Sequence, residues 1–358
     1  MKKLKRGIFM QSIVVVILLI VSGLLFVKVK DVSRKNENLS EQLTECQTEL
    51  SVYKDVNYGI NAHGQLSVQG TQLCDENGQP VQLKGMSTHG ITWYPRYTNA
   101  AALKTIKEYG ANVIRLAVYS DENESYLSDK EKNLDYLYNA IENALAQNMY
   151  VIVDWHVLQD ANPLVHKQDA EEFFEEISSH YGNHPGILYE ICNEPNGDTK
   201  WDDIVDYAND IIPLIRKNAP DSVIIVGTPG YSYKVEAVKE NPLAFSNVMY
   251  ALHAYIDVTY EEDGELHWLA EKMDLGLPVF VSEWGITDND KMDADLYEEN
   301  AVNFLKMMEE RNISWCNWSL SNKDEIYSMI LPECDKYSGW TEEDLTFSGK
   351  IILNALQN

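Results

Sequence analysis

Eight short runs of apolar and β-branched residues recur along the chain from about residue 80 onward, and they constrain its fold more than any other feature. Between them lie stretches with apolar residues near i, i+3, i+4 and i+7, the spacing of an amphipathic helix. Alternating strands and helices predict a parallel sheet, and eight such units favour closure, so we expect the α/β fold of a (β/α)8 barrel. The strands are predicted at Gln82–Met86, Val113–Tyr119, Tyr150–Trp155, Ile187–Ile191, Val223–Val226, Val248–Leu252, Val279–Ser282 and Ile313–Trp318. Helices are predicted at Asn99–Tyr109, Asn133–Gln147, Ala170–Tyr181, Asp203–Lys217, Leu266–Met273 and Tyr297–Glu310, with a last one within Thr341–Asn358.

The segment before the first strand alternates apolar and polar residues around Asp75–Gly78, a pattern that predicts a β-hairpin with a tight turn there. We expect this hairpin to cap the floor of the barrel. No Pro/Gly/Ser-rich linker interrupts the chain after Val56. Residues 57–358 are therefore interpreted as one domain, which we expect to be monomeric.

The N-terminus combines a basic tip with an uncharged apolar segment, Gly7–Val27, which is long enough to cross a bilayer as a helix. Because no site of small residues follows it, we interpret residues 1–30 as a cytoplasmic tip and a transmembrane signal anchor that leaves the folded domain outside a bacterial cell. Signal cleavage and secretion are the alternative. Residues 31–56 are polar and form either a helical stalk or a solvated spacer, and dimerisation through them stays open.

A formal net charge of -27 disfavours binding to nucleic acid or to an anionic membrane surface. A neutral polymer suits such a surface better. The five cysteines show no CxxC pair and suggest neither a zinc site nor a disulfide framework, so we treat them as buried small apolar residues.

Two glutamates, Glu194 and Glu283, follow apolar runs at the ends of the fourth and seventh predicted strands. Chemistry in such barrels takes place at these carboxyl ends, so the two side chains can face each other across one pocket. A carboxylate separation of about 5–5.5 Å implies double displacement at a sugar carbon, whereas about 6.5–9.5 Å implies inversion through a water. Either residue could instead be a structural ion-pair partner.

Arg115 lies inside the apolar strand VIRLAVY, where an unpaired guanidinium would be very costly. We expect it to meet a carboxylate, plausibly Glu283, and to keep that group ionised. A purely structural salt bridge is the alternative.

Three of the eight histidines, His89, His156 and His253, lie at predicted strand ends. A metal site is the rival interpretation, but the closely spaced HxH or HExxH pairs of zinc sites are absent from the sequence. We therefore favour neutral imidazoles that hydrogen-bond sugar hydroxyls or orient the carboxylates, with no metal and no cofactor.

Four of the eight tryptophans lie beside these strand ends. The broad face of a tryptophan packs well against the C–H face of a pyranose. Trp93 and Trp318 are the better candidates for such platforms, whereas Trp155 and Trp284 could equally belong to the barrel core.

The ordered strings KGMSTHG, VIRLAVY, VIVDWH, YEICNEPNG, ALHAY, VFVSEWG and WCNWSLSNKDE together resemble glycoside hydrolase family 5, within its bacterial endo-β-1,4-glucanase group. The resemblance runs from about Leu66 to the C-terminus. It implies a retaining, cofactor-free enzyme with Glu194 as general acid/base and Glu283 as nucleophile, acting on internal β-1,4 bonds of cellulose or related β-glucans.

The resemblance also implies roles for the surrounding side chains. Asn193 would hydrogen-bond the sugar 2-hydroxyl, and Arg115 and Tyr255 would hold the nucleophile. The remaining positions would contact glucan: His89, Tyr119, His156 and His253 at the cleavage subsite, Trp318 as its stacking floor, Trp93 one sugar further out, and Lys323 and Glu325 toward the non-reducing end.

Two features depart from the usual pattern of that family. The N-terminal anchor puts free secretion in doubt. Cys192 and Cys316 stand beside site residues, where they could pack silently or make the site sensitive to thiol reagents.

Three alternative functions stay open at this point. The same machinery could act on mannan, xyloglucan or mixed-linkage β-glucan. A non-catalytic glucan-binding surface protein would not need an ionised nucleophile beside a protonated acid. A phosphate-binding barrel enzyme is disfavoured by the acidic charge and by the lack of a Gly-rich loop late in the sequence.

Overall fold

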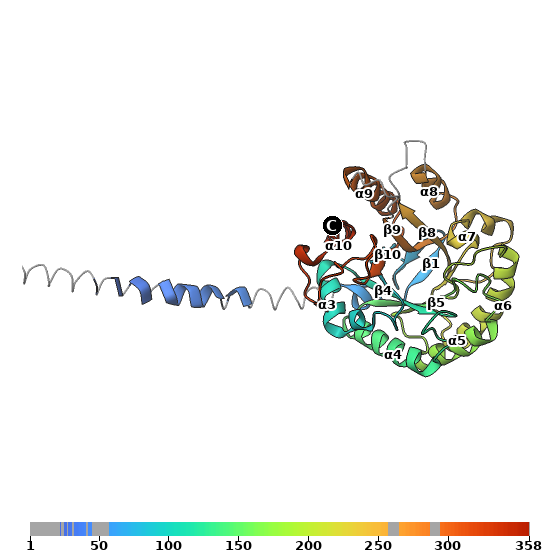
Figure 1. Ribbon diagram of the computed structural model, residues 1–358, viewed down its shortest axis with the longest axis horizontal. Helices are drawn as coiled ribbons and strands as arrows, with labels where there is room; N and C mark the ends of the chain where they lie inside the picture. Colours follow the sequence, from blue (N-terminus) through green and yellow to red (C-terminus); the bar gives the residue numbers. More distant parts are fainter. Residues whose placement is uncertain are drawn as a thin grey trace, which may run out of the picture. The chain divides into compact units, whose positions relative to one another are not determined.

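The computed structural model describes residues 22, 25–26, 28–30, 32–40, 42–44, 57–256, 265–286 and 294–357 (Figure 1). The chain divides into two units, Met1–Asn57 and Tyr58–Asn358. In the first unit, residues 32–40 and 42–44 are helical. The strands and the helices around them belong to the second unit.

The second unit is built around a closed parallel barrel, which confirms the predicted fold. Its strands are β3 (Lys84–Thr88), β4 (Val113–Tyr119), β5 (Tyr150–His156), β6 (Ile187–Glu190), β7 (Ile224–Val226), β8 (Val248–Ile256), β9 (Val279–Ile286) and β10 (Trp315–Leu320). Each strand pairs with the next in the chain, and β10 closes the ring against β3. All eight correspond to the predicted runs.

Helices surround the barrel (Figure 1). They are α3 (Ala100–Tyr109), α4 (Lys130–Ala146), α5 (Lys167–Tyr181), α6 (Trp201–Asn218), α8 (Glu265–Met273), α9 (Ala294–Glu310) and α10 (Phe347–Gln357), with short turns η1 (Pro95–Thr98), α7 (Pro229–Ser232), η2 (Val235–Glu240) and η3 (Glu342–Asp344). Asn99 begins α3 by accepting from the backbone amides of Ala101 and Ala102, the usual way to satisfy a helix N-terminus. The last helix, α10, lies within the predicted range Thr341–Asn358.

Alternate residues of each strand face the barrel interior and the helix layer, so the strands are buried on both faces. In β4, Val113 packs in the interior cluster while Ile114 and Leu116 pack beneath the helices. Arg115 occupies an interior position of this strand and is fully buried. Strand β4 is thus apolar on both faces except at Arg115, whose guanidinium points into the barrel interior.

A short antiparallel hairpin, β1 (Ser67–Gln69) with β2 (Gln72–Cys74), precedes the barrel. Its turn lies at Gly70, a turn that the sequence analysis did not predict; Gly70 has the left-handed backbone (φ 63°) that a two-residue turn needs. The Asp75–Gly78 turn exists as well, and its Asp75 carboxylate accepts from two backbone amides. It returns the chain to a single bridge between Cys74 and Pro80.

The hairpin region packs against the amino ends of the strands. Leu66, Leu73 and Leu83 are buried in the interior cluster together with Tyr150 and Phe280, the second residue of β9. The predicted cap on the barrel floor is therefore present. The opposite, carboxyl end of the strands is the end where the polar site lies.

Within the described residues, no helix is long and apolar enough to cross a membrane. The predicted signal anchor, Gly7–Val27, lies outside the described residues apart from Ser22, Leu25 and Phe26.

Candidate active site

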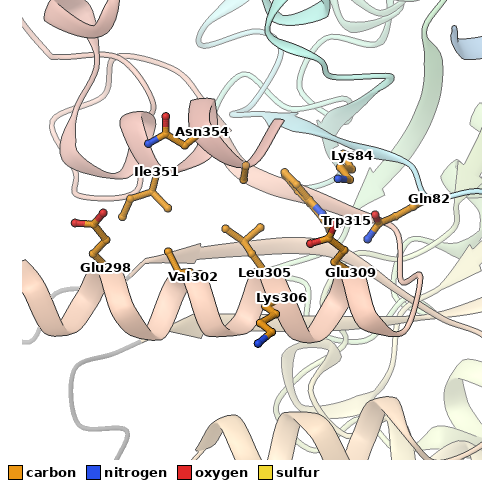
Figure 2. A pocket seen from close by; sticks show the side chains of 11 residues that line it. Gln82, Lys84, Glu298, Val302, Leu305, Lys306, Glu309, Trp315, Ile351 and Asn354 are labelled. Atoms are coloured by element: carbon orange, nitrogen blue, oxygen red, sulfur yellow. The ribbon is translucent and has the colours of Figure 1, made fainter. Parts of the chain in front are cut away.

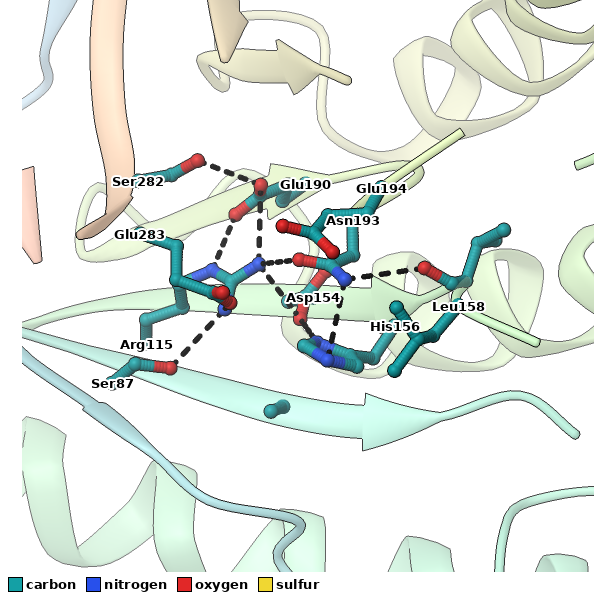
Figure 3. A network of polar contacts seen from close by, with 12 residues as sticks. Ser87, Arg115, Asp154, His156, Leu158, Glu190, Asn193, Glu194, Ser282 and Glu283 are labelled. Carbon is teal, nitrogen blue, oxygen red and sulfur yellow. Dashed lines mark hydrogen bonds and ion pairs between the residues drawn. The ribbon is translucent and has the colours of Figure 1, made fainter. Parts of the chain in front are cut away.

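Arg115 is the centre of the polar network at the carboxyl end of the barrel (Figure 3). Its Nη1 donates to Glu283 Oε2 at 3.0 Å, which is the predicted pairing. Its Nε donates to Glu190 Oε2 at 2.7 Å, and its Nη2 lies 3.1 Å from Asp154 Oδ2. Nη2 also donates to Asn193 Oδ1 at 2.7 Å. One guanidinium thus serves three buried carboxylates and holds the amide beside Glu194.

The charges of this network set the protonation states around Arg115. Burial alone would lower the pKa of Arg115, but Asp154, Glu190 and Glu283 raise it well above its usual value. Burial favours the neutral form of Glu190, but Arg115 and His253 together outweigh burial and lower the pKa of Glu190 to about 2. Burial raises the pKa of Asp154 well above its usual range, with the charges of Glu190 and Glu283 adding to it against Arg115. Glu190 is therefore an anion at neutral pH.

A bulge in β9 places Glu283 in the barrel. Ala251 pairs with Phe280 and His253 with Glu283, so two residues of β8 are matched by three of β9. As a result both Ser282 and Glu283 face inward, although they are consecutive. Tyr255 donates its hydroxyl to Glu283 Oε1 at 2.7 Å. The predicted pair, Arg115 and Tyr255, thus holds the two oxygens of Glu283.

Glu194 lies on the loop that follows β6. The amides of Asn193 and Glu194 donate to the carbonyls of Trp155 and Val157, so the loop continues alongside β5. Glu194 Oε1 lies 2.9 Å from His253 Nδ1. One carboxylate oxygen of Glu194, one of Glu283 and a ring nitrogen of His253 all lie within 4.8 Å of one another. The two carboxylates therefore face each other across a gap that is too narrow for the spacing of an inverting pair.

His253 differs from the other two predicted histidines in its charge. Burial disfavours its charged form, but the surrounding carboxylates of Glu190, Glu194 and Glu283 raise the pKa of His253 to about 9. Burial and nearby positive charge instead lower the pKa of both His89 and His156 to about 3. His253 is thus an imidazolium near neutral pH, contrary to the neutral state that the sequence predicts, whereas His89 and His156 agree with it.

Asn193 and His156 continue the polar network outward from Arg115. His156 Nδ1 lies 2.6 Å from Asp154 Oδ2, and Asn193 Nδ2 lies 3.2 Å from His156 Nε2. Asn193 also donates to the carbonyl of Val157 at 3.1 Å. The amide is therefore fixed from both sides, with its orientation set by Arg115.

Aromatic rings line one side of the site. Tyr119 and Trp318 belong to one small cluster, against which Trp93 and Tyr255 pack. The Trp318 ring lies 5.4 Å from that of His156 and 5.0 Å from that of His89. Trp155 and Trp284, by contrast, are fully buried in the core beneath the helices. The two candidate platforms are thus at the site, and the two ambiguous tryptophans are core.

The predicted outer contacts also come together. Lys323 Nζ lies 3.2 Å from His89 Nε2 and 2.6 Å from Glu325 Oε2. Glu325 Oε1 lies 3.8 Å from His89 Nε2. Lys323, Glu325 and His89 therefore form one polar group beside Trp318.

Three participants were not predicted from the sequence as site residues: Asp154, Glu190 and Ser282. Glu190 is the last residue of β6 and occupies the same inward-facing series as Leu188. A glutamate inside an apolar strand carries the same signal as Arg115 does, and that signal could have found it. Ser282 could not be found this way, because only the bulge turns it inward.

An exposed aromatic, Tyr231, also escaped the sequence analysis. It lies in α7, after the carboxyl end of β7, and Gly230, Tyr231 and Ser232 all have left-handed backbone. The amide of Tyr231 donates to Pro195 O at 3.0 Å, and Ser232 Oγ donates to Asn193 O at 2.6 Å. Tyr231 is 55% exposed, so an aromatic face stands free beside the loop that carries Glu194.

The described residues offer one cluster of possible metal ligands, made of Glu194, His253 and Glu283. Within this part of the chain, His89 and His156 do not join it. A site built from the three histidines, the rival interpretation of the sequence, is therefore not formed.

The four cysteines that the structure describes, Cys74, Cys192, Cys316 and Cys334, are free thiols. Cys192 and Cys316 are fully buried, and burial raises the pKa of both well above the usual value. Such thiols are poor nucleophiles, so they pack as small apolar residues.

A separate hollow of about 310 Å³ lies between α9 and α10 (Figure 2). Its wall includes Lys84 and Trp315, the first residues of β3 and β10, together with Val302 of α9. It therefore lies toward the amino ends of the strands, away from the two glutamates.

Comparison with known proteins identifies the family. The model of the family Cellulase (glycosyl hydrolase family 5) matches residues 74–324. Endoglucanase A of Butyrivibrio fibrisolvens is 43% identical over 303 residues, which are 83% of this chain and 70% of that protein. An endoglucanase of Clostridium saccharobutylicum is 40% identical over 296 residues, which are 82% of this chain and 65% of that protein.

Solved structures agree with this assignment. The catalytic domain of endoglucanase Cel5A from Thermobifida fusca superposes with a TM-score of 0.76 at 36% identity, covering 84% of this chain and 99% of that domain. A variant of the same domain has been solved in complex with cellotetraose, at the same TM-score and coverage. The chain therefore belongs to glycosyl hydrolase family 5, the cellulase family.

Proposed function

We propose that this chain is a retaining endo-β-1,4-glucanase that cleaves internal bonds of cellulose or related β-glucans. The observation that carries the proposal is the gap between Glu194 and Glu283, whose nearest carboxylate oxygens lie within 4.8 Å. A gap of this size suits direct attack on the anomeric carbon, because it leaves no room for a water between the carboxylate and the sugar. The family and its endoglucanase members support the same reaction.

In the first step Glu283 attacks the anomeric carbon while Glu194 protonates the departing glycosidic oxygen. Arg115 and Tyr255 bind the two oxygens of Glu283 and hold the carboxylate in position. The bond to the leaving glucan breaks and a covalent glycosyl-enzyme forms. In the second step Glu194, now a carboxylate, takes a proton from water, and the water releases the sugar with retained configuration.

The remaining side chains suit a glucan chain laid across the barrel mouth. Trp318 and Trp93 offer ring faces for sugars on the non-reducing side, where Lys323 and Glu325 supply polar contacts. The neutral rings of His89 and His156 can hydrogen-bond hydroxyl groups, and Asn193, beside Glu194, is the proposed partner of the 2-hydroxyl. Tyr231 extends the surface on the side of the leaving glucan, beside the Glu194 loop.

The roles of the two glutamates are tested with substrates of different reactivity. Glu283→Gln should lower hydrolysis of carboxymethylcellulose about 10⁴-fold or more, as loss of a nucleophile does. Glu194→Ala should still react with 2,4-dinitrophenyl β-cellobioside, and azide should yield β-cellobiosyl azide by attacking the covalent intermediate. Glu240→Gln, an exposed glutamate at the end of η2, is the control and should retain full activity. An α-azide product, or an active Glu283→Gln variant, contradicts the retaining mechanism.

The polysaccharide preference is tested by a substrate panel. The purified domain should hydrolyse carboxymethylcellulose and β-glucan faster than mannan or xyloglucan. A higher rate on mannan or xyloglucan would show that this polymer is the preferred substrate of the same mechanism and would contradict the proposed preference for β-1,4-glucan. Binding without hydrolysis of any polymer in the panel would favour a surface glucan-binding protein.

We further propose that Gly7–Val27 anchors the chain in the cell membrane with the catalytic domain outside. This rests on the sequence, in which an uncharged segment follows a basic tip. Secretion after cleavage is the alternative outcome, and it would appear as activity in the culture medium on a chain that lacks these residues.

A further inference from the structure

Glu190 is a buried carboxylate that the proposed reaction does not use. It lies at the end of β6 with no exposure, and Arg115 donates to it twice, at 2.7 and 3.3 Å. Its Oε1 also accepts from the hydroxyl of Ser282 at 2.8 Å. Glu190 therefore joins the nucleophile side of the site, through Arg115, to the inward-facing Ser282 of the β9 bulge.

The contacts of Ser282 continue toward Glu194. Ser282 Oγ lies 3.0 Å from His253 Nε2, and the other ring nitrogen, Nδ1, lies 2.9 Å from Glu194 Oε1. Glu190 itself is 3.7 Å from His253 Nε2, which is too long for a hydrogen bond. An unbranched chain of contacts thus runs from Glu190 through Ser282 and His253 to Glu194. Ser282 is fully buried and His253 is 3% exposed, so the chain is shielded from solvent.

The direction of each hydrogen bond in this chain follows from its first member. Because Arg115 and His253 keep Glu190 ionised, Glu190 can only accept, and the Ser282 hydroxyl must donate to it. The Ser282 oxygen is then an acceptor for His253 Nε2–H. With both ring nitrogens protonated, Nδ1–H donates to Glu194 Oε1. Glu194 Oε1 is thereby occupied as an acceptor.

We infer that Glu190 and Ser282 are positioning residues for the general acid, because they fix His253 as a donor to Glu194 Oε1 and so leave the transferable proton on Oε2. The inference rests on the proposed function and assigns it two further residues. Without Ser282 the His253 ring loses its only hydrogen-bond partner on the Nε2 side among the described residues. The ring can then turn, and Glu194 can hold its proton on the oxygen that faces His253.

The proton balance of the step is simple. The Oε2 proton passes to the glycosidic oxygen as the bond from the anomeric carbon to that oxygen breaks. Glu194 becomes a carboxylate, and His253 continues to donate to Oε1. His253 neither gains nor loses a proton, so the chain from Glu190 orients the acid without relaying charge.

The test compares two substrates that differ only in their need for an acid. Phenyl β-cellobioside has a poor leaving group that requires protonation, whereas 2,4-dinitrophenyl β-cellobioside leaves without it. Ser282→Ala should lower kcat/KM for the phenyl substrate by about 10- to 100-fold, within the contribution of general acid catalysis. The factor by which kcat/KM falls for the dinitrophenyl substrate should be at least about tenfold smaller. Activity on the latter also reports that the variant is folded with an intact nucleophile.

A matched control is available in Ser87→Ala. Ser87 is likewise a fully buried serine, and its hydroxyl accepts from Arg115 Nη1 at 3.2 Å, on the nucleophile side. The Ser87→Ala substitution should lower kcat/KM for both substrates by the same factor. Ser282→Thr keeps a hydroxyl and should recover most of the activity on the phenyl substrate.

Two results would overturn the inference alone: equal losses on both substrates for Ser282→Ala, or no recovery of phenyl hydrolysis in a Ser282→Thr variant that cleaves the dinitrophenyl substrate. A wild-type chain that is inactive on both substrates would instead overturn the proposed function, and the inference with it. A selective loss of activity on the phenyl substrate in Ser282→Ala, with recovery in Ser282→Thr, supports both the inference and the proposed function.

Discussion

Arg115 shows how far a single side chain can determine the order of a site. It is fully buried and contacts Asp154, Glu190 and Glu283, so its removal leaves three carboxylates without their counter-ion. Breaking a buried pair by removing one partner commonly costs about 3–5 kcal/mol. We expect Arg115→Met to lose at least this much unfolding free energy, measured by urea denaturation.

The control for this prediction is Arg311→Met. Arg311 forms a two-pronged pair with Asp274, but at the surface, where exposed ion pairs contribute about 0–1 kcal/mol. A similar loss of stability in both variants would show that the Arg115 network is no more important for folding than a surface pair.

His253 gives a prediction about pH and stability. Its pKa is about 9 in the folded chain, against about 6.5 for an unperturbed histidine. The folded state therefore binds this proton more tightly, and the resulting stabilisation is complete below about pH 6.5 and is lost as the pH rises through about 9. The loss should amount to about 1–3 kcal/mol between these values.

The measurement is a series of urea denaturations from pH 6.5 to 9.5 on wild type and on His253→Asn. The difference in unfolding free energy between the two proteins should shrink across this range. A constant difference would mean that His253 does not titrate there.

At the residue scale the sequence identified most of the site. Arg115, Glu194 and Glu283 were found because a charge beside or within an apolar run requires a partner. Glu190 follows the same rule but was overlooked. The charge state of His253 could not be found, because it depends on three carboxylates that meet only in the closed barrel.

At the scale of single elements, the bulge in β9 could not be predicted from the sequence. Strict alternation predicts one inward face, so Ser282 and Glu283 should point to opposite sides. The extra residue in β9 turns both inward. Nothing in the string VFVSEWG indicates an inserted residue, since the bulge arises from pairing with β8 and β10.

The left-handed turn of α7 gives a prediction for substrate binding. Because Tyr231 is exposed beside the Glu194 loop, Tyr231→Ala should raise KM for cellopentaose about 2- to 10-fold, the equivalent of one aromatic contact, with little change in kcat. Steady-state kinetics provide the measurement.

The control for this substitution is Trp268→Ala, an exposed aromatic on the outer helix α8. It should leave KM unchanged. A fall in kcat without a change in KM for Tyr231→Ala would indicate that the turn positions Glu194 rather than binds sugar.

At the scale of the whole molecule, the barrel could be predicted because its eight strands are buried on both faces and its helices carry one apolar face each. At the floor of the barrel the turn at Asp75–Gly78 was predicted, but the turn at Gly70 that joins β1 to β2 was not. Two turns occur within ten residues, and the one at Gly70 depends on a backbone conformation that the alternating pattern does not reveal.

The division of the chain at Asn57 leads to a prediction for truncation. A chain that begins at Tyr58 should hydrolyse carboxymethylcellulose at the full-length rate, whereas only the full-length chain should sediment with membranes. Fractionation followed by activity assays provides the measurement. Full-length protein that stays in the supernatant with its N-terminus intact would contradict the anchor.

The free thiols of the barrel bear on where this enzyme can be made. Cys192 and Cys316 are sealed in the core, and Cys74 and Cys334 are likewise unpaired. Folding therefore needs no disulfide bond at these four cysteines. The catalytic fold should reach the same state in a reducing cytoplasm as beyond the membrane, and reductants in a reaction mixture should leave its performance intact.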